Sequence, residues 1–254
     1  MSQNLSTLPT SSPDSYQRNV GCIIVAAGRS KRMNGRDKCF ALIAGKPLIS
    51  YTIDVFQKNS LVHKIILALH KDNMAQGQKL LRDFGWSKLT NIYLGGVRRQ
   101  DSVAYGLPYL RDCHWIMVHD GSRPCLHENL IERGLICAQE TGAAVAAIPV
   151  TDTIKLVDEG YVIQETPIRK NLWLAQTPQV FRRDVITTAY DRAVIDDIEA
   201  TDDASLVEKT GYQVKIYPGS YDNIKITTTY DLALAEIILD KEKKVHHYVP
   251  STDI

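Results

Sequence analysis

Short apolar runs alternate with segments of helical spacing along most of this chain, and that alternation limits the folds open to it. The runs are about strand length and rich in Val, Ile or Ala: Val20–Ala26, Lys64–Leu69, Asn91–Leu94, Trp115–His119 and Ala143–Val150. Between them, apolar residues recur on one helical face, as at Leu48, Ile49, Ile53 and Phe56. Because continuous apolar runs are typical of strands covered on both faces, we predict a mostly parallel sheet flanked by helices.

The alternation breaks at about residues 151–171. Thr151–Val157 and Tyr161–Thr166 flank an Asp-Glu-Gly turn, which predicts a β-hairpin. Neither face of this hairpin is clearly apolar, so we expect it to project from the body as an arm. The α/β pattern then returns at Arg182–Arg192, Asp202–Thr210, Gln213–Tyr217 and Tyr230–Leu239. The fold class predicted is α/β, with a single Rossmann-like sheet and a projecting β-hairpin arm.

The composition fits one domain with a full core. The chain has 254 residues, of which 44% are hydrophobic, and it carries 30 basic against 29 acidic residues. Nucleic-acid-binding proteins usually have a clearer basic excess, so we expect no nucleic-acid partner. No apolar run reaches the roughly 18–20 residues of a membrane helix, so we expect no membrane partner. Five cysteines without a CxxC pair indicate reduced thiols in a cytoplasmic protein.

The two ends of the chain differ from its middle. Residues 1–19 are rich in Ser, Thr, Pro and Asn, and we expect them to form a disordered extension. Residues 241–254 are expected to form a loose tail. The predicted domain therefore covers residues 20–240.

A basic loop containing glycine follows the first predicted strand. Between Ala26 and Lys38 it has two glycines and five basic residues. Backbone N–H groups at the end of a parallel strand can hold a phosphate, and glycine lets the backbone approach closely. The absence of GxxxxGK[ST] and GxGxxG disfavours a P-loop protein and a nicotinamide dehydrogenase. The alternative is a solvated loop, although its like charges would repel one another without an anion.

This loop resembles the nucleotide-binding loop of the cytidylyltransferases of the non-mevalonate isoprenoid pathway. Residues 26–33, AAGRSKRM, match that family's AAGxGxRM, and Lys38 matches the lysine of its PKQ. Ser30 replaces a glycine of the family pattern, and Asp37 replaces the proline. The resemblance implies that Arg32 and Lys38 act catalytically at the α-phosphoryl group, and that the nucleotide is contacted by Ala26, Ala27 and Gly28.

Two further segments resemble the family's nucleotide-side motifs. Residues 95–103 resemble GGxxRxxSV, which implies that Gly96 and Ser102 hold the cytosine and ribose. Residues 118–124 resemble VHDAARP, which implies that Asp120 contacts the nucleotide or the acceptor and that Arg123 binds phosphate. The alternatives are a helix N-cap at Asp101 and Ser102 and an Asp-Gly turn at Asp120.

Further segments resemble the acceptor-side motifs, in the family's order. Residues 150–169 resemble VxDTxK…TxxR, which implies that the arm crosses to a second subunit, where Thr153 and Arg169 bind the acceptor phosphate. Residues 174–181, 201–205 and 222–227 resemble xQTPQxF, TDDAS and xNxKIT. They imply acceptor contacts from Thr177, Thr201, Asp222 and Lys225. Arg169 and Lys225 would act catalytically by holding the acceptor phosphate. The alternatives are a surface charge at Arg169 and helix capping at Thr201 and Asp202.

Taken together, the resemblance implies an enzyme that transfers the cytidylyl group of CTP to 2-C-methyl-D-erythritol 4-phosphate. It also implies a homodimer joined through the arm, and Mg²⁺ or another divalent cation held mainly by the CTP phosphates, with Asp120 a candidate ligand. Arg169 and Lys225 would serve equally well for ribitol 5-phosphate or a related polyol phosphate. A non-catalytic nucleotide-binding module is the alternative from another class.

Overall fold

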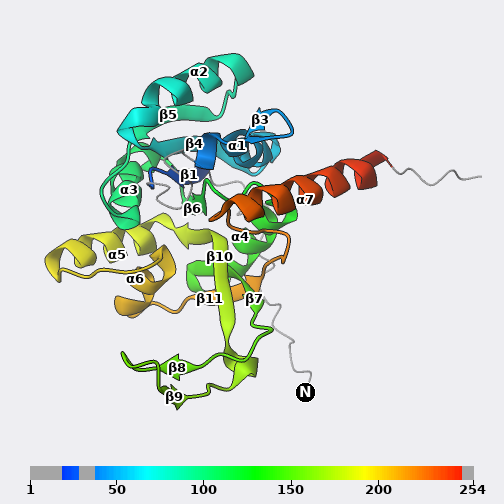
Figure 1. The fold of residues 1–254 in the computed structure, drawn as a ribbon. Coiled ribbons are helices and arrows are strands. Elements are labelled where there is room, and N and C mark those ends of the chain that lie inside the picture. The colour runs from blue at the N-terminus through cyan, green and yellow to red at the C-terminus, as the bar shows by residue number, and fades with distance from the viewer. Residues whose placement is uncertain (1–18, 29–37, 248–254) are drawn as a thin grey trace, which may run out of the picture.

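A seven-stranded sheet forms the centre of the protein, whose computed structural model describes residues 19–28 and 38–247, with side chains up to 241 (Figure 1). Its strand order is β11-β7-β10-β6-β1-β4-β5. All neighbours pair in parallel except β10, which is antiparallel to both β6 and β7. This confirms the predicted fold class. The strands are β1 Val20–Ala26, β4 Val62–Leu69, β5 Leu89–Leu94, β6 Trp115–Asp120, β7 Ala143–Pro149, β10 Trp173–Arg182 and β11 Lys215–Pro218.

Helices cover both faces of the sheet. Side chains of α1, α2 and α4 join one buried cluster, and side chains of α3, α5 and α6 join another. α2 and α4 each end at a glycine in the left-handed conformation, which favours glycine. The helices are α1 Leu48–Lys58, α2 Met74–Phe84, α3 Arg99–Gly106, α4 Asn129–Thr141, α5 Arg183–Ile195, α6 Asp203–Lys209 and α7 Thr229–His247.

Strand β1 shows why the apolar runs predict the sheet so well. Its residues alternate between the clusters: Cys22 and Ile24 pack in one and Ile23 in the other. A strand between two helical layers has no solvated face, so a continuous apolar run is required. The carboxyl end of β1 leads directly into the predicted nucleotide loop, of which residues 29–37 lie outside the described part of the chain.

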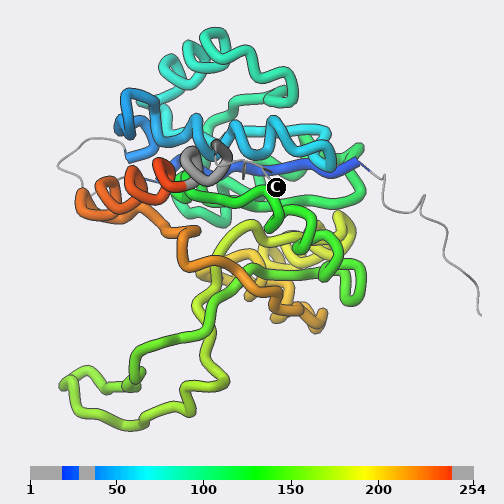
Figure 2. The backbone as a smooth tube through the Cα atoms, turned by 90° about the vertical axis from the view of Figure 1, so that its right-hand side faces the viewer, coloured from blue at the N-terminus to red at the C-terminus, as the bar shows by residue number. Residues whose placement is uncertain are grey.

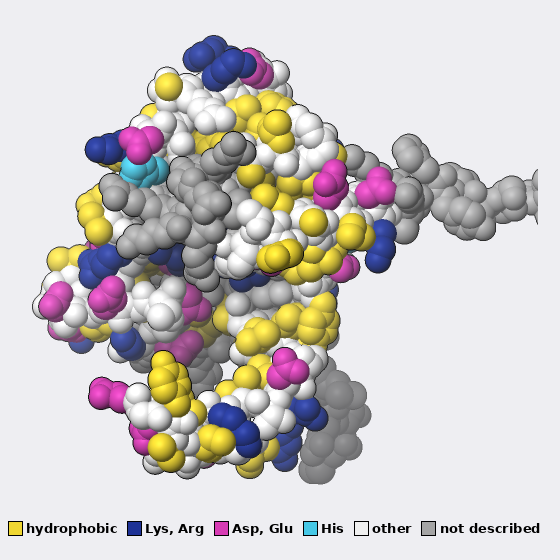
Figure 3. All heavy atoms as spheres, viewed as in Figure 1, with side chains coloured by type: hydrophobic (Ala, Val, Ile, Leu, Met, Phe, Trp, Pro, Cys, Tyr) yellow, Lys and Arg dark blue, Asp and Glu magenta, His cyan; other side chains and the backbone are white. Residues whose placement is uncertain are grey.

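The predicted arm is present and projects from the body (Figures 1 and 2). It carries a short antiparallel pair, β8 Leu156–Val157 and β9 Ile163–Glu165. Both strands are shorter than predicted. Their turn is organised by Asp158, whose Oδ1 accepts from the backbone N–H groups of Gly160 and Val162 at 2.9 and 3.0 Å. Apolar side chains gather on the arm between charged ones (Figure 3), and the most exposed of them are Tyr161, Ile168 and Val162.

The structure corrects the prediction at the C-terminal end. The loose tail expected from Lys241 is wrong for residues 241–247, because α7 continues to His247. The apolar face of α7, with Ala235, Ile238 and Leu239, packs in a third cluster beside Ile226. This packing holds the segment before α7 against the body. Within the described ranges, no helix combines the length and apolar character needed to cross a membrane.

Short elements complete the chain. The 3₁₀ turns are η2 Lys38–Phe40, η3 Lys71–Asn73, η4 Leu107–Leu110 and η5 Arg169–Asn171, and a small hairpin joins β2 Leu42–Ile43 to β3 Lys46–Pro47. η2 matters most for the site, because its buried Cys39 and Phe40 anchor the turn that carries Lys38.

Candidate active site

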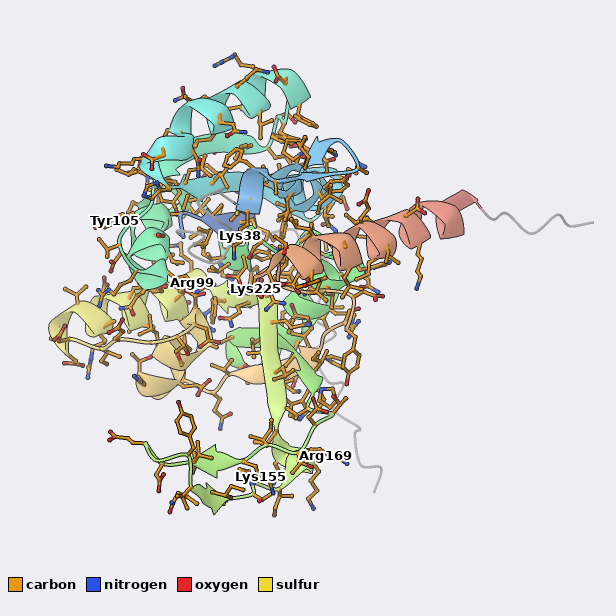
Figure 4. All side chains as sticks on the ribbon, viewed as in Figure 1. Lys38, Arg99, Tyr105, Lys155, Arg169 and Lys225 are labelled. Carbon is orange, nitrogen blue, oxygen red and sulfur yellow. The ribbon has the colours of Figure 1, made fainter. Side chains whose placement is uncertain are left out.

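A cleft of about 200 Å³ opens beside the carboxyl ends of β1 and β6. This is the edge of a parallel sheet where ligands gather. Eight of the predicted site residues line it together: Ala26, Ala27, Gly28, Lys38, Gly96, Ser102, Asp120 and Lys225. Figure 4 shows Lys38, Arg99 and Lys225 near one another at the centre of the molecule. The remaining lining comes from Val25, Cys39, Val97, Arg98, Arg99 and Ser122.

The segments that follow β1 and β5 form one wall of the cleft, and they pack closely where Gly95 meets the side chain of Ala27. A Cβ atom added at Gly95 would lie 2.2 Å from the Cβ of Ala27, so the wall requires glycine there. Ser102 holds the segment between β5 and α3 in place. Its Oγ accepts from the N–H of Gly96 at 3.0 Å and donates to the carbonyl of Arg98 at 3.2 Å. The result is a narrow backbone-lined edge next to the end of β1.

Helix α3 begins earlier than the sequence suggests. The predicted cap at Asp101 and Ser102 is wrong in position, because Arg98 is the N-cap residue and Arg99 begins the helix. Asp101 instead closes a capping box, its Oδ2 accepting from the N–H of Arg98 at 3.0 Å. The shift turns Arg99 into the cleft wall.

Asp120 stands at the end of β6, with three cations around its carboxylate. Arg99 Nε donates to its Oδ1 at 3.0 Å, Lys225 Nζ lies 2.8 Å from its Oδ2, and Arg123 Nε lies 3.5 Å from Oδ2. Burial alone would raise the pKa of Asp120, but these cations outweigh it and hold the pKa far below its usual value. The carboxylate is therefore ionised throughout the physiological pH range.

A buried pair behind Asp120 holds its backbone. Thr177 Oγ1 accepts from the Asp120 N–H at 3.0 Å and lies 3.0 Å from His119 Nδ1. His119 Nε2 lies 3.3 Å from the Arg123 carbonyl, which can only accept, so Nε2 carries the ring proton and Nδ1 accepts from Thr177. Burial lowers the pKa of His119 to about 3, so the ring is neutral. Thr177 and His119 support the site from within the sheet.

The two lysines of the cleft come from opposite ends of the chain. Lys38 Nζ donates to the carbonyl of Ile226 at 2.9 Å, across 188 residues of sequence. Lys225, next to Ile226, extends to Asp120. Their ammonium groups therefore lie in the same cleft, although the local sequence around either lysine does not indicate where the other lies.

The other predicted residues lie elsewhere. Thr153 and Arg169 are exposed on the arm, where Arg169 Nη1 donates to the Thr151 carbonyl at 2.7 Å. Figure 4 shows Arg169 far from Lys225.

Thr201 is exposed, and its neighbour Asp202 caps α6, as the alternative interpretation predicts, by accepting from the Ser205 N–H at 3.1 Å. Asp222 lines a separate cavity, Arg123 and Thr177 are buried behind Asp120, and Arg32 lies outside the described residues.

Sequence reasoning missed Arg99 and its buried partner Asp203. Arg99 Nη1 donates to Asp203 Oδ2 at 2.7 Å while Nε holds Asp120. Burial lowers the pKa of Arg99, but the two carboxylates outweigh it and raise the pKa above its usual value. Both residues stand inside motifs that the sequence analysis singled out, at the arginine of GGxxRxxSV and the second aspartate of TDDAS. An arginine in one motif and an aspartate in another are a possible ion pair, and this is the signal by which the sequence could have indicated both residues.

The donor set limits how a metal ion could bind. No group of His, Cys, Asp and Glu side chains suited to a metal occurs among the described residues. Asp120 is the one carboxylate among the described residues that line the cleft, and it already faces three cations. The cleft therefore fits a cation that a substrate's phosphates bring with them, with at most one protein carboxylate oxygen beside it.

The fold and the cleft together define a class of protein. A backbone-lined edge at the end of β1, next to lysine and arginine side chains and one ionised carboxylate, suits an enzyme that handles a nucleotide through its phosphates. No Ser-His-Asp set is found among the described lining residues. The arrangement is that of a nucleotidyltransferase.

Comparisons with known proteins specify the family. The family model for 2-C-methyl-D-erythritol 4-phosphate cytidylyltransferase (IspD) matches residues 20–241, and this chain belongs to that family. A 2-C-methyl-D-erythritol 4-phosphate cytidylyltransferase from Dehalococcoides mccartyi strain CBDB1 is 48% identical over 222 residues, covering 87% of this chain and 96% of the relative. The resemblance found in the sequence is confirmed.

Solved structures agree. The crystal structure of 4-diphosphocytidyl-2C-methyl-D-erythritol synthase from Anaerococcus prevotii has a TM-score of 0.79 at 27% identity, covering 88% of this chain and 99% of that one. The 2-C-methyl-D-erythritol 4-phosphate cytidylyltransferase of Thermus thermophilus has a TM-score of 0.71 at 30% identity, covering 86% and 98%. Each alignment covers more than four fifths of this chain.

Proposed function

We propose that this protein transfers the cytidylyl group of CTP to 2-C-methyl-D-erythritol 4-phosphate. The products are 4-diphosphocytidyl-2-C-methyl-D-erythritol and diphosphate. Family membership over residues 20–241 supports the substrates. The observation that carries the chemistry is the convergence of Lys38, Lys225 and Asp120 in one cleft beside the end of β1.

The reaction brings two anions together, so positioning and charge stabilisation are the main requirements. An oxygen of the acceptor phosphate attacks the α-phosphorus of CTP, and the bond from that phosphorus to the bridging oxygen of the diphosphate breaks. Lys38, with Arg32, would stabilise the charge at the α-phosphoryl group, and Lys225 would hold the acceptor phosphate. No general base is needed, because the attacking phosphate is already ionised.

The wall of the cleft would bind the nucleotide. Backbone groups of Ala26, Ala27 and Gly28 would contact the phosphates, and Gly96 with Ser102 would hold the cytosine and ribose. Asp120 would contact the nucleotide or an acceptor hydroxyl. Mg²⁺ would be held mainly by the triphosphate oxygens, and when bound it neutralises part of their charge.

The remaining acceptor contacts would come from outside the cleft. Thr201 and Asp222 stay in this proposal as acceptor contacts. Arg123 and Thr177 were predicted as acceptor contacts too, but burial next to Asp120 favours a supporting role for both.

Two subunits would complete each site. Thr153 and Arg169 lie on an arm away from their own chain's cleft, so they would reach the acceptor phosphate of a partner subunit in a homodimer. Exposed apolar side chains on the arm support burial against a second subunit. We infer a cytoplasmic location from the five cysteines, which form no disulfide.

A diphosphate-release assay tests the proposal. CTP, Mg²⁺ and methylerythritol phosphate should release diphosphate, whereas UTP in place of CTP should give little. Ribitol 5-phosphate serves as a second acceptor, and equal rates with it would reassign the acceptor. Tight CTP binding without diphosphate release with either acceptor would indicate a non-catalytic nucleotide-binding module.

A further inference from the structure

A buried acid behind the cleft pairs with the arginine that holds Asp120. Asp203, in the first turn of α6, is fully buried and is not among the described residues that line the cleft. Its Oδ2 accepts from Arg99 Nη1 at 2.7 Å, and its Oδ1 accepts from the Tyr190 hydroxyl at 2.5 Å. Building on the proposed function, we propose that Asp203 and Tyr190 are positioning residues that fix Arg99, and through it Asp120, for cytidylyl transfer.

The orientation of Arg99 depends on two carboxylates. Its planar guanidinium directs Nε to Asp120 at 3.0 Å and Nη1 to Asp203 at 2.7 Å. The third nitrogen, Nη2, is buried and has no hydrogen-bond partner within the described part of the chain. A planar guanidinium bonded to two carboxylates has one orientation, whereas a guanidinium bonded to only one can rotate about that contact.

The charges around Asp120 explain why a second carboxylate is needed. Arg99, Arg123 and Lys225 all lie within 3.5 Å of its oxygens. With Asp120 alone, three cations would share one carboxylate in a largely buried space. Asp203 supplies a second negative charge outside the cleft lining. Arg99 therefore contacts only Oδ1 of Asp120, and Oδ2 is left for Lys225, for Arg123 at 3.5 Å and for the substrates.

Asp203 itself cannot move to follow Arg99. Gln179, on β10, accepts from the Ala204 N–H at 3.0 Å and donates to Asp202 at 2.7 Å. These bonds join the first turn of α6 to the central sheet. The hydroxyl of Tyr190, 5% exposed on α5, fixes the remaining carboxylate oxygen. Asp203 is thus an anchor held by a strand and a neighbouring helix.

Steady-state kinetics of three variants, Asp203→Asn, Tyr190→Phe and the double variant, test the assignment. Asp203→Asn should lower kcat by about 10- to 100-fold, as for other groups that orient a reacting residue, with each KM changing less than about threefold. Tyr190→Phe should lower kcat severalfold. The double variant should be no slower than Asp203→Asn, because Tyr190 acts only through Asp203.

Crystal structures of the wild type and of Asp203→Asn give a readout that does not require activity. The Arg99 Nε to Asp120 Oδ1 distance, 3.0 Å here, should lengthen beyond hydrogen-bond range, to more than about 3.5 Å. If Asp203→Asn does not fold, the same distance and kcat measured in Tyr190→Phe decide the matter. Asp196→Asn, which removes an exposed carboxylate paired with Arg192, is the matched control and should behave as wild type.

Three results would overturn the inference. They are an unchanged kcat in Asp203→Asn, an unchanged Arg99 position, or kcat losses that multiply in the double variant. A lower melting temperature with wild-type kcat would assign Asp203 to stability alone. Failure of the wild type to release diphosphate from CTP would instead count against the proposed function, and the crystallographic distance would still test the positioning of Arg99.

Discussion

At the scale of single residues, the charge state of Asp120 links the stability of the fold to pH. Burial raises its pKa, but Arg99, Lys225 and Arg123 more than offset burial, so the pKa is depressed in the folded protein. A carboxyl with a depressed pKa stabilises the fold above its unfolded pKa, roughly 3.9, and loses that contribution as the pH falls toward the folded pKa. The cluster should therefore stay intact down to mildly acidic pH.

Asp120→Asn tests this linkage. At pH 7 the variant should lower the free energy of unfolding by about 3–5 kcal/mol, because it removes the carboxylate that pairs with buried Arg123, with Arg99 and with the more exposed Lys225. The difference from the wild type should shrink as the pH falls from about 4 toward 2. Urea unfolding across this range measures it. Asp184→Asn, in an exposed pair with Arg182, should change stability by less than about 1 kcal/mol at any pH. A pH-independent difference for Asp120→Asn would contradict the linkage.

Lys38 gives the corresponding prediction for catalysis. Its ammonium faces the cleft while it is bonded to the Ile226 carbonyl. Lys38→Ala should lower kcat by about 100- to 1000-fold, with a smaller change in KM for CTP, because its charge matters most at the transition state. Lys64→Ala, which removes a lysine paired with Asp112 outside the cleft, is the control. Wild-type turnover in Lys38→Ala would remove this residue from the mechanism.

At the scale of elements, the arm leads to a prediction about acceptor binding. Arg169 precedes Lys170 in η5, at the base of the arm, and both are exposed. Arg169→Ala should raise KM for the acceptor at least about tenfold, with a smaller effect on KM for CTP, because a phosphate–arginine contact is lost. Lys170→Ala should leave both KM values unchanged. Equal effects of the two substitutions would indicate a general loss of surface charge rather than a specific contact.

Elements with a regular pattern are predicted well from the sequence. The bounds of β1 are predicted without error, because a strand between two helical layers must be apolar throughout. β10 was not predicted. It pairs with β7 through residues 173–175 and 179–181, and its register shifts between Ala175 and Gln179. The interruption contains the buried polar Gln176 and Thr177 and also Pro178, a composition that disfavours a central strand.

Some residues of the candidate site were likewise predictable from the sequence, and others were not. Glycines and cations that follow strands could be found locally, because strand ends share one edge of a parallel sheet. The pairing of Asp203 with Arg99 could not be found locally, although both residues stand in family motifs, because they are 104 residues apart and the pairing depends on how α3 and α6 pack. Local pattern also missed the true start of α3, since a capping box with arginine at the N-cap lacks the usual Ser, Thr, Asp or Asn.

At the scale of the whole molecule, the proposed homodimer makes a prediction about mixed subunits. If the arm crosses over, each site takes Lys38 from one chain and Arg169 from the other. A mixture of Lys38→Ala and Arg169→Ala subunits would then form heterodimers in which one site is intact and the other carries both changes. At acceptor concentrations far below the raised KM of the Arg169→Ala sites, where those sites contribute little, random exchange in equal amounts should restore roughly a quarter of wild-type activity.

The assay is performed after unfolding and refolding the two variants together, with each variant refolded alone as the control. Sedimentation should show a dimer at micromolar concentration in every sample. Recovery no greater than the mean of the two controls would mean that each chain supplies both residues to its own site. An active monomer would exclude the arm exchange altogether.

The bond between Lys38 and the Ile226 carbonyl has a consequence for the order in which the protein becomes competent during synthesis. A nascent chain that has emerged only through α6 already contains the glycine-bearing loops, Asp120 and its buried anchor. It lacks Lys225 and the carbonyl that aligns Lys38, and it lacks α7, which packs beside that segment. On the proposed mechanism, chemistry must therefore wait until the segment from β11 through α7 has left the ribosome, and a product truncated after α6 would keep the proposed nucleotide-binding residues but lack Lys225.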